Sequence, residues 1–363
     1  SLNAVPTATD ANVATFDATS PACTVNASVR VCNGLDFTGY TNTITMTFQI
    51  TVSGSVTLAA GMGIAGTGIL AVNATSTLTS NGKAWPNALT LNGNVTYTLA
   101  DNWDVDGLLN IGGATQTING FQITASAGLT HVGASAVASG TTNLILDGTG
   151  TVTGSTGGGV IRNNLTINTA GTITFASGNT FFYNTGTLTY TAGTVVTTGN
   201  TLSCGAATTF VCNGITWNDV TLNGGVTMTL SENLNVSGLL TVGASAQATT
   251  PTGNTFNASG GLRFGGTTGT VSGTTVINVN GTGTLDGPSA TTGGINNPIT
   301  INAPGGTVTV AATFRILLNQ LLYTAGTVVT DTGTWGTGPA RRMRLFEGFR
   351  IKLISGRLII RQK

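Results

Sequence analysis

The sequence contains very little charge, and this shortage excludes several kinds of protein. Charged residues make up 7% of the 363 positions, against roughly a quarter in an ordinary soluble domain. Glutamate occurs twice and lysine three times, so residues that favour helices are scarce. A disordered chain combines high charge with low hydrophobicity, whereas 40% of the residues here are hydrophobic. The composition therefore predicts an ordered, all-β protein.

Signals for membrane insertion, export and common enzyme chemistry are also missing. We find no run of about 18 uninterrupted apolar residues, so we expect no transmembrane helix and no membrane insertion. The opening SLNAVPTATD has neither the basic start nor the apolar core of a signal peptide, and it does not begin with Met, so export stays undecided. No Ser/His/Asp or Cys/His arrangement and no glycine-rich phosphate motif is present. The sequence therefore predicts a non-enzymatic protein without a cofactor or metal.

What the sequence does contain is threonine, glycine and a long internal repeat. Thr takes 72 positions and Gly 53, a composition that suits pleated strands joined by tight turns. The octapeptide YTAGTVVT stands at residues 190–197 and again at 323–330, and the sequence from residue 80 matches the sequence from residue 212. Residues 31–61 resemble part of the same unit. We therefore predict an N-terminal partial repeat (1–79), solenoid block A (80–211), solenoid block B (212–340) and a basic C-terminal hairpin or cap (341–363).

Each block is too long for one coil of a repeat fold, but it contains several short strands. In the first block, runs at 89–91, 95–99, 108–111 and 121–124 alternate with NG, DG and GG turns, about ten residues apart. This pattern favours a β-solenoid, a parallel β-helix-like rod in which each coil buries its apolar face against the next coil. A β-sandwich shares the alternation and the turns. The duplication of a multi-coil block favours the solenoid.

The C-terminal segment differs sharply from the rest of the chain. Residues 341–363 hold 8 of the 13 Lys and Arg residues and carry a net charge of +7, whereas residues 1–340 carry −6. The stretch FRIKLI-SG-RLIIR predicts a hairpin with apolar side chains on one face and basic side chains on the other. We expect a terminal cap or an oligomer clamp, which would cover open strand edges. Its residues are Leu345, Phe346, Phe349, Arg350, Ile351, Lys352 and Leu353.

The four cysteines form two similarly placed pairs. Cys23 and Cys32 bracket TVNASVRV, and Cys204 and Cys212 bracket GAATTFV. Buried thiols and disulfides both fit this pattern, and the first pair would face each other across a hairpin that turns near residue 27. Zinc binding is not expected, because there is no CxxC motif and no neighbouring His.

The densest acidic group consists of Asp101, Asp104 and Asp106 in DNWDVDG. Its spacing has features of calcium loops and of the carboxylate groups in polysaccharide-cleaving β-helices, although a solvated turn is the simpler interpretation. The matching segment of the second copy, SENLNVSG, keeps only Glu232 as an acid.

His131 and the pair Asp286 and Arg263 are the remaining candidates for catalytic residues. The single histidine, His131, has no base or nucleophile near it in the sequence, so we expect a surface position or packing between coils. Residues that meet only in the fold, such as Asp286 and Arg263, would be needed for acid–base catalysis.

Several stretches resemble a known class of protein. AVPTATDANVATFDATS, VCNGLDFTGYTNTITMT and LFEGFRIKLISGRLII are similar to segments of the long Gly/Thr-rich structural proteins of tailed bacteriophages. The resemblance covers most of the chain through motifs of low complexity. It implies a virion appendage such as a tail fibre, tailspike or head fibre, which is typically a homotrimer that contacts the host surface and other virion proteins.

These observations together predict a non-enzymatic fibre or spike subunit, located on the extracellular virion particle and involved in host attachment. Trp85, Trp103 and Trp217 are candidate contacts for host glycans, although packing between strands explains them equally well. The basic segment lacks an aromatic stacking series, so we expect no nucleic-acid partner. The alternatives are a bacterial cell-surface adhesin and a polysaccharide depolymerase on a β-helix scaffold.

Overall fold

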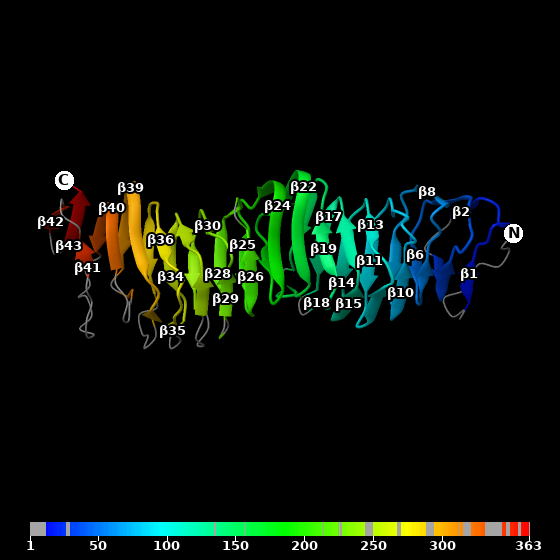
Figure 1. Cartoon of the computed structure of the whole chain (residues 1–363), viewed down its shortest axis with the longest axis horizontal. Helices are drawn as coiled ribbons and strands as arrows, with labels where there is room; N and C mark the ends of the chain where they lie inside the picture. Colours follow the sequence, from blue (N-terminus) through cyan, green and yellow to red (C-terminus); the bar gives the residue numbers. More distant parts are fainter. Residues whose placement is uncertain are drawn as a thin grey trace. The chain divides into compact units, whose positions relative to one another are not determined.

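The structure of the chain is a computed structural model that describes most of its residues. The described residues are 12–26, 30–133, 136–155, 157–212, 214–223, 225, 227–243, 250–266, 270–287, 294–311, 313–314, 321–330, 343–345, 349–354 and 357–362, with the backbone alone from residue 330 onward. They form strands, turns and bends but no helix, and hence no helix that would cross a membrane. Parallel stacked coils, about 14 turns in all, form a β-solenoid. The predicted fold is confirmed (Figure 1), and the β-sandwich alternative is wrong because the coils stack through parallel pairing.

The chain divides into two compact units, each of which is described by itself. Unit 1 comprises residues 1–182 and 191–196, and unit 2 comprises residues 183–190 and 197–363. The predicted block boundaries at 79/80, 211/212 and 340/341 follow the sequence repeat and stay predictions.

Unit 1 consists of three-sided coils, most of which have one short strand on each face. Face A contains β1 (Val13–Thr15), β4 (Gly34–Asp36), β7 (Val56–Thr57), β10 (Ser76–Thr79), β12 (Thr96–Leu99), β15 (Gln116–Gly120), β18 (Val137–Ser139) and β21 (Val160–Ile161). Face B contains β2 (Cys23–Val25), β5 (Thr43–Met46), β8 (Gly63–Gly66), β13 (Trp103–Val105), β16 (Gln122–Ala125) and β19 (Asn143–Leu146). Face C contains β3 (Arg30–Cys32), β6 (Ile50–Val52), β9 (Leu70–Val72), β11 (Leu89–Asn92), β14 (Leu109–Gly112), β17 (Gly128–Val132) and β20 (Gly150–Thr153). The long strand β22 (Asn164–Phe175) pairs with β19 and then with β20, and β23 (Thr180–Phe182) follows it.

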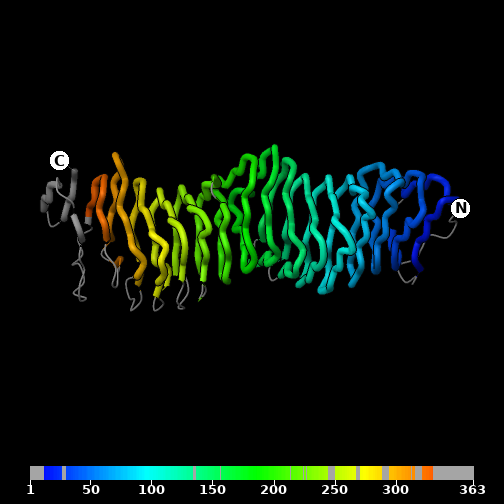
Figure 2. The backbone as a smooth tube through the Cα atoms, in the orientation of Figure 1, coloured from blue at the N-terminus to red at the C-terminus, as the bar shows by residue number. Residues whose placement is uncertain are grey.

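Successive coils of unit 1 stack on one another, as the backbone trace shows (Figure 2). Val13 pairs with Gly34 and Ser76 pairs with Tyr97, so one coil takes 21 residues at each of these places. Because the strand positions recur with this period, side chains of one kind form columns along the stack. An inward column on face A runs through Leu35, Val56, Leu78 and Leu99, each at most 4% exposed. Burial of each such side chain stabilises the fold by roughly 2 kcal/mol.

Unit 2 repeats the three-sided plan. Face D contains residues 187–190 of β24 (Thr187–Val196), β26 (Thr208–Val211), β29 (Thr227–Leu230), β32 (Thr250–Gly253), β35 (Thr270–Val271) and β38 (Gly294–Ile295). Face E contains β27 (Thr216–Trp217), β30 (Leu234–Val236), β33 (Phe256–Ala258) and β36 (Ile277–Val279). Face F contains β25 (Thr201–Cys204), β28 (Asp219–Leu222), β31 (Leu240–Val242), β34 (Gly261–Phe264) and β37 (Gly283–Asp286). The long strands β39 (Ile299–Val310) and β40 (Leu321–Thr330) pair in parallel across faces E and F.

The sequence duplication is reproduced by equivalent structure in the two units. β22 and β39 are each 12 residues long and begin beside the matching NNL and NNP motifs. Asn163 and Asn297 are both fully buried, and their Nδ2 atoms donate to the carbonyls of Thr142 and Thr275 at 3.1 and 2.9 Å. A buried amide needs such partners to offset its desolvation. The two asparagines therefore fix the same corner of the coil in each copy.

The last two strands of the chain depart from parallel stacking. β42 (Phe349–Ile354) and β43 (Arg357–Gln362) pair antiparallel, with Ile354 opposite Arg357. The predicted hairpin with its two-residue connection is therefore confirmed. β41 (Met343–Leu345) pairs with the first half of β40, and β43 pairs antiparallel with its second half. The strands that follow β40 thus occupy its outer edge along both halves, as expected of a cap.

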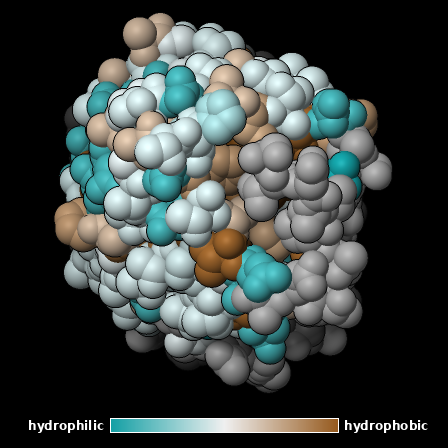
Figure 3. Space-filling view, turned by 90° about the vertical axis from the view of Figure 1, so that its right-hand side faces the viewer, coloured by the Kyte–Doolittle hydropathy of each residue, from teal (hydrophilic) through white to brown (hydrophobic). Residues whose placement is uncertain are grey.

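The outer surface is only weakly polar. Face A alternates buried Leu and Tyr with outward Thr, as in Thr96-Tyr97-Thr98-Leu99 of β12. Viewed onto the N-terminal end of unit 1, most described atoms are pale, the colour of intermediate hydropathy (Figure 3). Threonine keeps the backbone extended and limits the exposed apolar area without adding charge.

Candidate functional site

Three carboxylates of unit 1 gather on face B. In β13, Trp103 and Val105 point into the core and Asp104 points outward and is exposed. The register of β13, β16 and β19 places Asp106, Ser126 and Asp147 at the same position of three successive coils. Ser126 Oγ donates to Asp147 Oδ1 at 2.7 Å. Asp104, Asp106 and Asp147 therefore form one acidic patch.

The surroundings of Asp104 raise the pKa of its carboxyl group. Partial desolvation by the surrounding protein is the largest cause, and the charges of Asp106 and Asp147 raise the pKa further. A carboxyl group with a raised pKa holds its proton at higher pH, which is what general-acid chemistry requires. The described residues contain no group of three His, Cys, Asp or Glu side chains arranged to hold a metal ion.

Asp101, the first acid of DNWDVDG, has a different role. Its Oδ1 and Oδ2 accept the backbone N–H groups of Ser80 and Asn81 at 2.7 and 2.6 Å. Asn81 has a φ of +51°, which costs energy for a residue other than glycine. Asp101 thus stabilises a strained turn of the preceding coil. Sequence reasoning grouped Asp101 with the two other acids and missed Asp147, although the coil period would have indicated Asp147.

The three tryptophans lie in the core. Trp85 and Trp103 are 1% exposed and Trp217 is 0% exposed, and Trp85 Nε1 donates to the carbonyl of Ala88 at 3.2 Å. Their prediction as glycan contacts is therefore wrong. The physical reason is that each indole occupies an inward position and fills the coil interior. Among the described residues, the exposed aromatic side chains are instead Phe48 and Phe121, at 44% and 55%.

All four cysteines are free thiols. The alternative of a disulfide between Cys23 and Cys32 is wrong, because the two residues do not face each other across a hairpin. Their strands, β2 and β3, belong to different sheets, and each pairs in parallel with the next coil. Cys204 and Cys212 are buried, and Cys212 Sγ donates to the carbonyl of Leu188 at 3.3 Å. Desolvation raises the pKa of Cys212 to about 12 and that of Cys32 to about 11. Such thiols are inert at neutral pH.

His131 lies inside unit 1 on β17. It is 1% exposed, and neither ring nitrogen has a hydrogen-bond partner among the described residues. Desolvation lowers its pKa to about 4. Of the two expected positions, packing between coils is therefore the one observed, and His131 is neutral at physiological pH.

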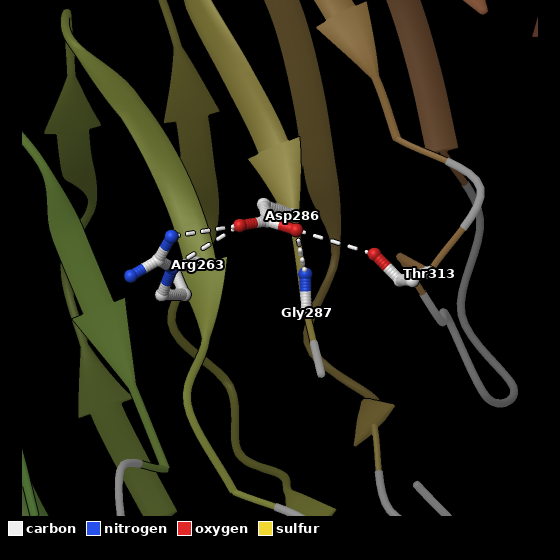
Figure 4. A network of polar contacts seen from close by, with 4 residues as sticks. All are labelled: Arg263, Asp286, Gly287 and Thr313. Atoms are coloured by element: carbon white, nitrogen blue, oxygen red, sulfur yellow. Dashed lines mark hydrogen bonds and ion pairs between the residues drawn. The ribbon is translucent and has the colours of Figure 1, made fainter. Parts of the chain in front are cut away.

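Arg263 and Asp286 meet on face F of unit 2 (Figure 4). The Arg263 Nη2 and Nε atoms lie 2.9 and 3.2 Å from Asp286 Oδ2. The other oxygen accepts the N–H of Gly287 at 2.7 Å and the hydroxyl of Thr313 at 3.2 Å. Burial pushes the pKa of Asp286 upward, but the hydrogen bonds from Arg263, Gly287 and Thr313 and the charge of Arg263 outweigh it and lower the pKa. This arrangement ties neighbouring coils together and keeps Asp286 ionised, so it is unsuited to proton donation.

The structure describes the predicted cap or clamp residues only in part. Phe346 lies outside the described residues, and the other six belong to strands of which the backbone alone is described. Their proposed contacts stay predictions.

No known protein family, curated protein or solved structure matches the sequence of this chain. Its function must therefore be inferred from the fold and from the chemistry of its surfaces.

Proposed function

We propose that the chain is a non-enzymatic structural subunit of a fibre or spike on a bacteriophage virion, where it contacts the host surface. The observation that carries the proposal is the architecture of each unit, in which coils of about 21 residues enclose an apolar core under a weakly polar surface. Such a fold lengthens by addition of coils, since each coil contacts only its neighbours. The resemblance to Gly/Thr-rich phage proteins supplies the virion setting.

The proposed subunit assembles as a homotrimer, and its C-terminal segment holds the trimer together. The position of β41 and β43 against the outer edge of β40 supports a capping role for the same segment. An exposed parallel edge would otherwise pair with other chains without specificity. The high positive charge of residues 341–363 provides contacts for the more acidic remainder of neighbouring chains.

Light scattering on a sizing column tests this proposal directly. We expect the full chain to have the mass of a trimer and a chain that ends at residue 340 to lose that assembly. Substitution of Arg350 and Lys352 by Gln removes charge while it keeps the strand, so it should weaken the trimer less than the truncation does. Gold-labelled antibodies against the chain should also mark phage particles. A monomer that the antibodies never find on particles would overturn the proposal.

The acidic patch on face B favours a second candidate, a polysaccharide depolymerase. The raised pKa of Asp104 beside Asp106 and Asp147 is the observation in its favour. The test is release of reducing ends from capsular polysaccharide or lipopolysaccharide by the wild type and by the Asp104→Asn/Asp106→Asn double variant. A structural subunit releases none, whereas a depolymerase loses activity in the double variant.

A further inference from the structure

Face A of unit 1 carries an ordered array of small uncharged polar side chains. Array 1 is defined by outward residues of β10, β12, β15 and β18. They are Thr77, Thr96, Thr98, Thr117, Asn119 and Ser139. Thr77 pairs with Thr98 and Thr98 with Asn119, which makes one column. Thr96 pairs with Thr117 and Thr117 with Ser139, which makes a second column beside it.

The spacing of array 1 follows from the sheet geometry. Neighbouring strands lie about 4.8 Å apart, and two residues along a strand span about 6.7 Å, so the array is a rectangular lattice with these two repeats. Thr98 on β12 and Thr77 on β10 are exposed, and the rest of the array is half-buried. β-branched threonine has few rotamers, so its hydroxyl positions are largely set by the backbone. The strands that carry the array lie side by side (Figure 1).

Unit 2 carries an equivalent lattice on face D. Array 2 consists of Thr187, Thr209, Thr227, Thr229, Thr250 and Thr252. Its long column pairs Thr187 with Thr209, Thr209 with Thr229 and Thr229 with Thr252. Its short column pairs Thr227 with Thr250. The hydroxyl of Thr252 donates to the carbonyl of Met228 at 3.3 Å, which fixes its direction and leaves its lone pairs as acceptors.

The sequence repeat shows that the outward pattern is maintained while other positions change. Thr96-Tyr97-Thr98 of the first block corresponds to Thr227-Met228-Thr229 of the second. The buried residue between the two threonines is a different one, but both outward threonines are the same. In the same comparison, Asp104 of the acidic patch corresponds to Asn235. The chain thus duplicates the hydroxyl lattice and not the acidic patch.

From these observations we infer that arrays 1 and 2 bind the surface of ice. Ice presents uncharged hydrogen-bond donors and acceptors that repeat in two dimensions, which is the kind of partner that a rigid, uncharged lattice of hydroxyls complements. A threonine hydroxyl can donate one hydrogen bond and accept two, and Thr252, whose hydroxyl donates to the Met228 carbonyl, presents acceptors only. Each threonine also carries a methyl group beside its hydroxyl. A charged side chain would hold its own hydration shell and break the lattice, and none of the array residues is charged. This activity goes beyond the proposed role on a virion and does not depend on it.

The test is the thermal hysteresis of the full chain, measured as the gap between the melting point and the growth point of a single ice crystal, together with inhibition of ice recrystallisation. We expect wild type to show both effects. Thr98→Tyr places a bulky ring in array 1 and should weaken them, and Thr98→Tyr/Thr229→Tyr should reduce both to the buffer value. The matched control is Thr124→Tyr/Thr241→Tyr, which alters outward threonines of faces B and F and should retain the activity.

Circular dichroism at low temperature verifies that each variant is folded. Absence of hysteresis and of recrystallisation inhibition in the folded wild type would overturn the inference, as would full activity in the folded double array variant. Equal loss in the control variant would also overturn it, because binding would then not depend on the arrays. None of these outcomes bears on whether the chain forms a trimer or is found on phage particles, so each of the two proposals can fail without the other.

Discussion

Acid should destabilise unit 1 through His131, and the structure sets the size of the effect. The imidazole is buried without a hydrogen-bond partner among the described residues, and its pKa is lowered to about 4 from an ordinary value of 6.5. The folded state therefore holds the neutral ring and the unfolded state binds the proton more tightly. Because the folded pKa is the lower one, the contribution is fully present above pH 6.5 and is lost as the pH falls toward 4.

The expected loss follows from this difference in pKa. Each pKa unit corresponds to about 1.4 kcal/mol, so complete protonation removes about 3 kcal/mol of stability. At pH 5 the unfolded histidine is almost entirely protonated and the folded one is mostly neutral, which gives a loss of about 2 kcal/mol relative to pH 7.5. Two variants isolate this contribution. His131→Leu removes the titration and keeps an apolar core, whereas His131→Gln removes the titration and keeps a buried polar group.

The measurement is urea denaturation followed by circular dichroism at pH 7.5, 6.0 and 5.0. Wild type should lose stability between the first and last pH, and both variants should lose about 2 kcal/mol less over that interval. His131→Gln should be the less stable variant at every pH, because its amide is buried where the ring had no partner. A pH dependence in His131→Leu as steep as in wild type would refute the reasoning and assign the acid sensitivity to carboxylates.

Three other predictions concern packing and surface contacts. Trp217→Ala should lower the free energy of unfolding by about 3–5 kcal/mol, because it leaves a cavity in the core. The exposed control Phe121→Ala should change it by less than about 0.5 kcal/mol. Equal effects of the two variants in denaturation curves would contradict the burial of Trp217. Gly128→Ala should cost more than about 1 kcal/mol, since φ is +106° and a Cβ would lie 2.3 Å from the Thr151 carbonyl oxygen. Its control, Gly82→Ala, keeps a positive φ but meets no atom within 4 Å, so its melting temperature should fall less. Arg263→Ala should cost less than about 1 kcal/mol, because half of the Arg263 side chain is exposed, and a larger loss in thermal unfolding would show that the ion pair is a major tie between coils.

Local features of the sequence predicted the strands and the C-terminal hairpin well. The run expected at 89–91 is β11 (Leu89–Asn92), and the two-residue connection expected between FRIKLI and RLIIR agrees with the pairing of Ile354 with Arg357. These features depend on alternation and on turn residues a few positions apart. Of the three acids of the patch, Asp104 and Asp106 were predicted together and Asp147 was missed. Asp147 is distant in the sequence and meets Asp104 only through the stacking of β13, β16 and β19.

The sequence by itself determined that the chain is all-β, repetitive and built from stacked coils, because composition, alternation and duplication are properties of neighbouring residues and of the repeat length. Only the tertiary structure decided which side of each strand faces the core. That choice buried Trp217 and His131 and aligned the threonines of arrays 1 and 2. The pairing of coils likewise placed Cys23 and Cys32 in different sheets. The physical reason is register: a shift of one residue exchanges the two faces of a strand, and the register of a solenoid is set by the length of each whole coil.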